Sequence, residues 1–96
     1  MQINITSKNC DLSEQSKQYT HKKLEKLRPH EDIITSIAIN YHTEKLEHIA
    51  EGHISLPGNT INARAEHKTS QGAMDGLIDK LVRLVVKHKE KQTSHR

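Results

Sequence analysis

Residues 74–91 read MDGLIDKLVRLVVKHKEK, and this stretch decides the fold. Its apolar residues and one histidine recur every three or four positions, which is the spacing of one buried stripe on an α-helix. The stripe consists of Met74, Leu77, Ile78, Leu81, Leu84, Val85 and His88. Ser70 is a good N-cap, so we expect a helix from about Gln71 to Lys91. At ~1.5 Å per residue this helix is roughly 30 Å long and spans the width of a small domain.

The segment before this helix alternates polar and apolar residues with a period of two, which is typical of β-strands. The residues expected to face the core are Ile37, Ile39 and Tyr41, then Ala50, Gly52, Ile54 and Leu56, then Ile61, Ala63 and Ala65. Pro57-Gly58 fits the centre of a type II turn, because proline presets the first position and glycine accepts a positive φ at the second. Three successive strands with short connections predict an antiparallel meander.

The amino-terminal part predicts one further strand and one further helix. Gln2 to Thr6 alternates polar and apolar residues and indicates a strand. Either Asp11 or Ser13 caps a helix that runs to about Arg28. Pro29 is expected to stop this helix, because proline has no N–H group and disfavours helical geometry in the preceding residue.

The predicted order is therefore β-α-β-β-β-α, an α+β two-layer sandwich. A four-stranded mixed sheet with both helices on one face buries every apolar stripe and is similar to a double-stranded RNA-binding domain. The first two strands can pair in parallel through a right-handed crossover, and the other pairs are antiparallel. We expect residues 1–91 to form this single domain and residues 92–96 to form a disordered tail.

Composition excludes several kinds of protein. With 96 residues of which 32% are hydrophobic, the chain has no room for a large cofactor cavity, and we expect no cofactor. Two tyrosines, no Phe and no Trp nearly exclude RNA recognition by stacking of unpaired bases on aromatic rings. Cys10 is the single cysteine, which excludes an internal disulfide and a cysteine zinc knuckle. The chain shows no signal peptide or apolar run of membrane-spanning length, so we expect a cytoplasmic protein without membrane contact.

The net charge of +3 is concentrated at the two ends of the chain, while the middle is acidic. In the last helix Lys80, Arg83, Lys87 and Lys91 follow each other at spacings of three, four and four along one edge of the buried stripe. Asp75 and Asp79 fall on the opposite flank. Such a row predicts binding to a polyanion, and lysines that contact phosphate position a protein without reading sequence.

The first helix carries a second cationic row. Lys22 and Lys26 lie one turn apart on its exposed side, and Lys23 lies at the edge of its apolar sector. If the two helices lie side by side, we expect the two rows to border one groove. The expected ligand is the backbone of structured RNA.

The same residues resemble a known family. The pattern DGLIDKL-x-R-x-x-x-KHK within residues 75–89, the opening MQINIT and the segment KKLEKL at 22–27 are similar to bacterial ribosome hibernation promoting factors. These belong to the ribosome-associated inhibitor or sigma-54 modulation protein family, and the resemblance covers essentially the whole chain. It implies the β-α-β-β-β-α fold, and binding to the small ribosomal subunit and its 16S rRNA in the channel used by messenger RNA and tRNA.

The resemblance also implies which residues bind RNA and which partners act with them. The matching cations are Lys22, Lys23, Lys26, Arg28, Lys80, Arg83, Lys87, Lys89 and Lys91. Short members of the family block translation in stationary phase and, with ribosome modulation factor, stabilise inactive 100S ribosome dimers. This chain matches the short form, and we expect it to be a monomer when free. A sister protein with a longer tail, the ribosome-associated inhibitor, keeps ribosomes as monomers and is one alternative.

Other functions are also open to the sequence. A general double-stranded RNA-binding module shares the last three strands and helix, but concentrates cations at the start of that helix, where Thr69 to Gly72 is uncharged here. A protein adaptor that uses the open sheet face is a further alternative. No helical H-x-x-x-H or H-E-x-x-H spacing occurs among the eight histidines, so we expect no metal site. No phosphate-binding glycine loop or G-x-S-x-G elbow is present, and we expect no enzymatic activity.

Overall fold

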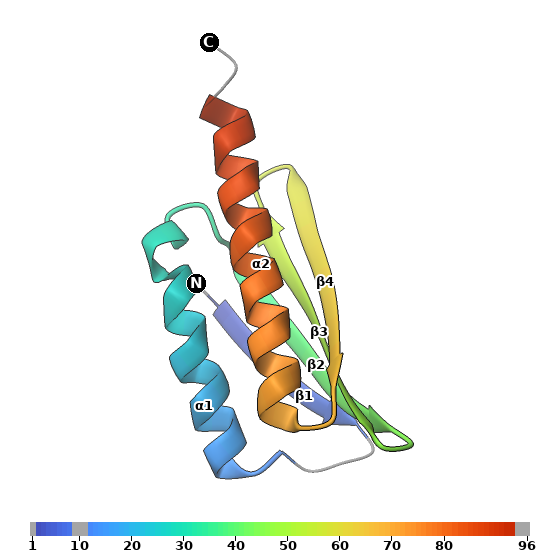
Figure 1. Cartoon of the computed structure of the whole chain (residues 1–96). Helices are drawn as coiled ribbons and strands as arrows, with labels where there is room; N and C mark the ends of the chain where they lie inside the picture. Colours follow the sequence, from blue (N-terminus) through green and yellow to red (C-terminus); the bar gives the residue numbers. More distant parts are fainter. Residues whose placement is uncertain (1, 9–11, 94–96) are drawn as a thin grey trace.

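Four strands form one sheet in the order β1-β2-β3-β4, and two helices cover one of its faces (Figure 1). The structure is a computed structural model that describes residues 2–8 and 12–93, with side chains described as far as residue 90. The elements are β1 (Gln2–Lys8), α1 (Glu14–Leu24), the 3₁₀ helix η1 (Glu25–His30), β2 (Ser36–Glu44), β3 (Glu47–Leu56), β4 (Asn59–His67) and α2 (Ser70–Thr93). This arrangement confirms the predicted α+β fold and its element order.

The strand pairings place rows of apolar side chains on the face beneath the helices. β1 pairs with β2 in parallel, while β2–β3 and β3–β4 are antiparallel, as predicted. One row across the sheet consists of Ile3, Ile37, Ile54 and Ile61. The next row on the same face consists of Ile5, Ile39, Gly52 and Ala63. In this second row the side chains become small on β3 and β4, the two strands that α2 contacts most.

Small residues let α2 lie close against the sheet. A Cβ atom added at Gly52 would lie 2.8 Å from Cδ1 of Leu81 and 3.2 Å from Cδ1 of Leu77. One added at Gly76 would lie 3.3 Å from Cβ of Ala65. Leu77 and Leu81 are completely buried by this approach. A glycine is therefore required at position 52, because the helix occupies the space that a side chain would take.

The ends of the elements differ in part from the prediction. Ser13 caps α1 with its Oγ accepting from the Ser16 N–H at 3.1 Å, whereas Asp11 lies outside the described residues. The prediction of Ser70 as the N-cap of α2 is wrong, because Ser70 is already helical. Thr69 takes the cap position, and its Oγ1 accepts from the Gly72 N–H at 3.0 Å. At the β3–β4 turn Gly58 has a φ of 74°, as the predicted type II turn requires.

The first α-helix ends earlier than predicted, and the chain continues helically past Pro29. The α-helical part stops at Leu24, and η1 then carries the chain through Pro29 to His30. In an α-helix the Pro29 ring would clash with the carbonyl of Glu25, four residues before it. The tighter 3₁₀ geometry removes this conflict, so the proline changes the helix type at Glu25 and does not stop the helix at Arg28.

The last helix differs from the prediction at its carboxyl end and in two residues of the predicted buried stripe, of which His88 is half-buried and lines an open hollow. α2 continues to Thr93, two residues beyond the predicted Lys91, and residues 94–96 lie outside the described residues. Leu84 is 37% exposed, so its assignment to the buried stripe is wrong. It lines two hollows at the edge of β4, beyond which the described residues form no further strand.

The close packing of α2 on the sheet can be tested at Gly52. Gly52→Val places a branched side chain where Leu77 and Leu81 lie, and we expect a loss of about 1–3 kcal/mol in the free energy of unfolding from overpacking. Urea denaturation measures this loss. Ala38→Val on the outer face of β2 is the matched control and should change stability by less than about 0.5 kcal/mol. An equally small effect at Gly52 would contradict the close approach of helix and sheet.

Candidate nucleic-acid interface

One flank of α2 carries cations that face β4. Lys80, Arg83 and Lys87 are all exposed on this helix. The Lys80 Nζ donates to the backbone carbonyl of Arg64 on β4 at 2.5 Å. Among the described side chains, no carboxylate lies within ion-pair distance of Arg83 or Lys87. Both guanidinium and ammonium groups are therefore available to an external anion.

Two adjoining hollows lie between this flank and β4. One of about 270 Å³ is lined by Asn59, Thr60, Ile61, Asn62, Leu84, Lys87 and His88. The other, of about 310 Å³, is lined by Asn62, Ala63, Arg64, Lys80, Arg83 and Leu84. The two share Leu84 and Asn62, so they form one groove along the edge of β4, which we call the α2–β4 groove.

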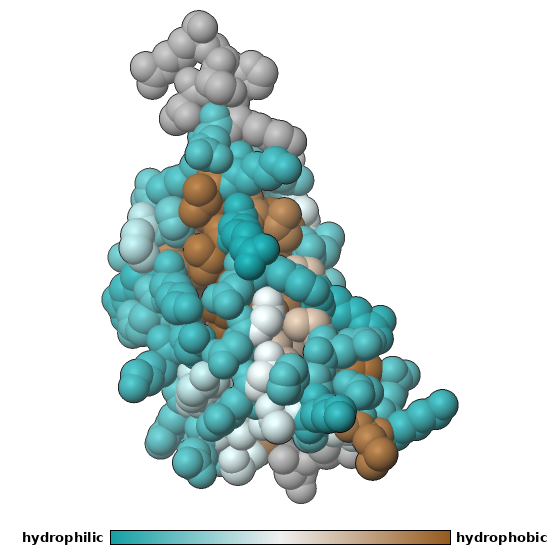
Figure 2. All heavy atoms as spheres, in the orientation of Figure 1, coloured by the Kyte–Doolittle hydropathy of each residue, from teal (hydrophilic) through white to brown (hydrophobic). Residues whose placement is uncertain are grey.

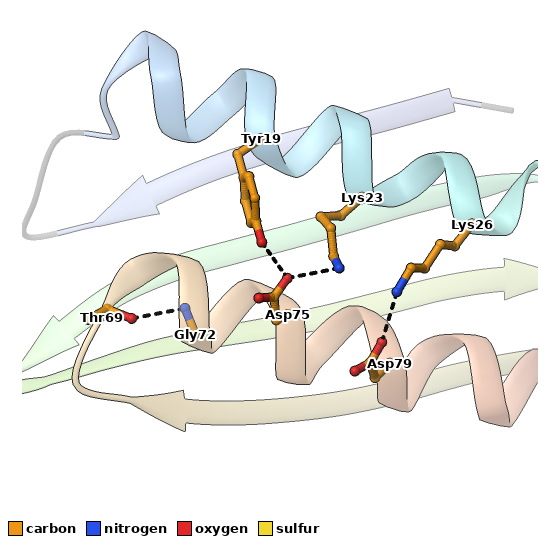
Figure 3. A network of polar contacts seen from close by, with 7 residues as sticks. All are labelled: Tyr19, Lys23, Lys26, Thr69, Gly72, Asp75 and Asp79. Atoms are coloured by element: carbon orange, nitrogen blue, oxygen red, sulfur yellow. Dashed lines mark hydrogen bonds and ion pairs between the residues drawn. The ribbon is translucent and has the colours of Figure 1, made fainter.

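The opposite flank of α2 is joined to the first helical segment by ion pairs (Figure 3). Lys23 of α1 lies with its Nζ 3.1 Å from Oδ1 of Asp75. Lys26 of η1 lies with its Nζ 3.4 Å from Oδ1 of Asp79. The Tyr19 hydroxyl donates to Asp75 Oδ1 at 2.7 Å. These contacts fasten α1 and η1 to α2.

The charge states of these groups follow from the contacts. The hydrogen bond from Tyr19, together with Lys23, lowers the pKa of Asp75 below its ordinary value. The hydrogen bond to Asp75 raises the pKa of Lys23 and also raises the pKa of Tyr19, because removing either proton would leave its atom facing a carboxylate. At neutral pH Asp75 is therefore ionised, while Lys23 and Tyr19 keep their protons, and these forms favour the contact.

The expectation that the two cationic rows border one groove is wrong. Asp75 and Asp79 stand between them and neutralise Lys23 and Lys26, while the row of α2 turns away toward β4. The physical reason is the rotation of α2, because burying Leu77 and Leu81 directs the acidic flank to α1 and the cationic flank to the sheet edge.

The remaining predicted RNA-binding residues are spread over the helical layer. Lys22 is exposed on α1. Arg28 of η1 lies with its Nε 2.7 Å from Oε2 of Glu25, and this pair lowers the pKa of Glu25 and raises that of Arg28. Lys89 lies on the side of α2 away from β4, 3.8 Å from Asp32. Lys91 belongs to α2, but its side chain lies outside the described part of the chain.

Three site residues were not found from the sequence. No sequence pattern indicates the role of Tyr19, whose hydroxyl donates to Asp75. Arg64 and Leu84 line the α2–β4 groove, whereas the sequence predicts Leu84 in the core and no role for Arg64. One signal was available: Asp75 and Asp79 are four residues apart on one helix, and Lys23 and Lys26 are three apart on the other, which is suitable spacing for pairing across two helices.

The described residues also bear on metal binding and membrane contact. Within residues 2–8 and 12–93, no three side chains of His, Cys, Asp or Glu come together in a way that could hold a metal ion. Cys10 lies outside these residues. No helix in the same ranges combines the length and the apolar character needed to cross a membrane.

Comparison with known proteins identifies similar sequences over the whole length of the chain. Residues 3–93 match the family described as Sigma 54 modulation protein / S30EA ribosomal protein. The chain is 37% identical over 94 residues to the ribosome hibernation promoting factor of Pseudomonas putida KT2440, which covers 98% of this chain and 92% of that protein. It is 36% identical over 95 residues to the protein of the same name from Escherichia coli K12, covering 99% and 100%.

Solved structures show the same fold. A ribosomal subunit interface protein from Coxiella burnetii superposes with a TM-score of 0.88 at 37% identity, covering 94% of this chain and 99% of that one. The N-terminal domain of Protein Y from Thermus thermophilus superposes with a TM-score of 0.83, covering 92% and 99%. Its identity is 22%, so it supports the fold alone.

The ion pair between α1 and α2 predicts a pH-dependent stability. Because the pKa of Asp75 is lowered in the folded chain, its ionised form stabilises the fold fully above about pH 5, and this contribution is lost as the pH falls through ~3.9 toward the folded pKa. The Asp75 side chain is 40% exposed, so we expect Asp75→Asn to cost up to about 1 kcal/mol at pH 7. Urea unfolding of the two proteins should give a difference that shrinks at pH 3, and a difference independent of pH would contradict the assignment. Tyr19→Phe keeps the ion pair between Lys23 and Asp75, so it should lower the free energy of unfolding by less than Asp75→Asn does over the same pH range.

Proposed function

The chain belongs to the Sigma 54 modulation protein / S30EA ribosomal protein family of ribosome hibernation factors, and from this premise we propose that it binds the small ribosomal subunit through its helical layer. The proposed ligand is the phosphate backbone of 16S rRNA in the channel that messenger RNA and tRNA use. Bound there, the protein occupies the decoding site and stops translation by occlusion.

The observation that carries this proposal is the cationic flank of α2. Arg83 and Lys87 are exposed and have no carboxylate partner among the described side chains, so a phosphate can bind them without first displacing an internal anion. Lys80 adds a third cation beside them, with one of its protons used by the Arg64 carbonyl. Cations of this kind release condensed counterions when they meet phosphate, and this release favours binding.

The other candidate cations are expected to contribute less. Lys23, Lys26 and Lys89 already have carboxylate partners, and each contact with phosphate would compete with an ion pair inside the protein. Arg28 competes in the same way with Glu25. We therefore propose that Lys80, Arg83 and Lys87 supply most of the phosphate contacts. Lys22 and Lys91 complete the proposed set.

The family relationship also supports a role in ribosome dimerisation. The relatives from Pseudomonas putida and Escherichia coli are named ribosome hibernation promoting factors, and this chain covers 92% and 100% of their lengths. We propose that this chain, like the short members of the family, acts in stationary phase with ribosome modulation factor and favours inactive 100S dimers over the monomer-keeping role of the ribosome-associated inhibitor.

A sedimentation experiment tests the proposed function. The chain should co-sediment with small subunits in a sucrose gradient. When ribosome modulation factor is added to ribosomes, the 100S peak should be larger with the chain than without it. Replacing Lys80, Arg83 and Lys87 together by Gln should lower the slope of log affinity against log salt by about two to three units, at ~0.7–0.9 per lost phosphate contact. The matched control is Lys23→Gln with Lys26→Gln, which should change the slope by less.

Three outcomes would contradict the proposal. An unaltered salt slope in the triple variant would eliminate the α2 row as the phosphate-binding surface. Full simultaneous occupancy of the subunit by the protein, messenger RNA and initiator tRNA would exclude occlusion. Equal retention of plain RNA duplexes and small subunits would favour a general double-stranded RNA-binding module.

A further inference from the structure

The α2–β4 groove differs from the rest of the helical layer because one of its walls is the edge of a β-strand. Residues 59–64 of β4 line it consecutively, and side chains of α2 form the opposite wall. Within residues 2–8 and 12–93, β4 is the last strand of the sheet, and only one of its sides is paired with another strand. The other side presents peptide N–H and C=O groups along the groove.

The hydrogen bond of Lys80 shows that these backbone groups are accessible. Its ammonium reaches the carbonyl of Arg64 at 2.5 Å, so this carbonyl points into the groove and away from β3. At the other end of the groove the Asn59 side-chain amide lies 3.3 Å from Nδ1 of His88. The groove therefore offers hydrogen-bonding groups at both ends.

Leu84 supplies an apolar surface between the cations. It borders both hollows and is 37% exposed, although most of the apolar side chains of α2 are buried. Figure 2 shows hydrophobic atoms at the surface over the carboxyl-terminal half of α2, the half that contains Leu84. Arg83 precedes Leu84 directly in the chain, and Lys87 follows one turn later. An apolar side chain flanked in this way suits a ligand that is apolar on one face and anionic along one edge.

A nucleotide of an unpaired RNA strand has this combination of groups. Its phosphate suits Arg83 and Lys87, its 2′-hydroxyl both donates and accepts hydrogen bonds, and the flat face of its base or the ribose can cover Leu84. In a duplex the base faces are stacked inside and cannot reach Leu84. We propose, on the basis of the function proposed above, that the α2–β4 groove binds an unpaired strand of RNA and places a nucleotide against Leu84.

Two other occupants fit the groove less well. A second copy of the chain that paired through β4 would bring two rows of Lys80, Arg83 and Lys87 next to each other, and like charges would oppose the contact. An acidic peptide added to the edge of β4 would have to displace Lys80 from the Arg64 carbonyl, because strand pairing uses the backbone carbonyls of the edge.

Two substitutions on α2 form a matched pair for the test. Leu84 and Val86 are each 37% exposed on the same helix, but Val86 does not line the groove. The probes are a fluorescently labelled single strand of ten uridines and a labelled RNA duplex of ten base pairs, followed by fluorescence anisotropy. We expect Leu84→Ala to weaken binding of the single strand by about three- to tenfold, with the duplex unchanged. Val86→Ala should leave both affinities unchanged.

The outcomes separate this inference from the proposed function. If Leu84→Ala and Val86→Ala act alike, or if Leu84→Ala weakens the duplex as much as the single strand, the inference is overturned while the phosphate row stands. If Arg83→Gln with Lys87→Gln leaves the salt dependence of both probes unaltered, the proposed function fails first. Leu84-dependent binding of a ten-residue polyglutamate peptide without Leu84-dependent RNA binding would assign the groove to a protein partner and would also overturn the inference.

Discussion

The contact of Leu77 and Leu81 with Gly52 sets the rotation of α2 on the sheet. Both leucines are completely buried, and the missing side chain at Gly52 lets the helix approach until their methyl groups nearly touch the strand. Rotating α2 by one residue, ~100°, would expose these leucines and bury a charged neighbour, which costs several kcal/mol. The direction of every charged side chain on α2 follows from this packing.

The fixed rotation gives α2 two flanks with different electrostatic roles. Toward α1 and η1 it presents Asp75 and Asp79, which pair with Lys23 and Lys26 and hold the helical layer together. Toward β4 it presents Arg83 and Lys87, which have no carboxylate nearby in the described part of the protein. Lys23 and Lys26 thus form ion pairs within the fold, whereas Arg83 and Lys87 are available to an external anion. Similar cations differ in their electrostatic surroundings according to the neighbour that the packing provides.

Local periodicity was enough to predict the element order, the strand pairing and the buried stripe of α2, because helices and strands repeat their inward residues at different spacings. It could not predict that Pro29 continues a 3₁₀ helix or that Thr69 caps α2 in place of Ser70, since both depend on backbone geometry at a single residue. The pairing of Lys23 with Asp75 and the exposure of Leu84 depend on the distance between helices and on where the sheet ends. These are tertiary properties that no short segment contains.

We propose that RNA approaches the β4 flank of α2, because the lysines at the α1–α2 junction are already paired with carboxylates. Acetylation of each lysine, measured by mass spectrometry in the free chain and in the complex with small ribosomal subunits, tests this most directly. We expect Lys80 and Lys87 to lose most of their reactivity in the complex, while Lys23 and Lys26 change little. Strong protection of Lys23 and Lys26 with unchanged Lys80 and Lys87 would contradict it.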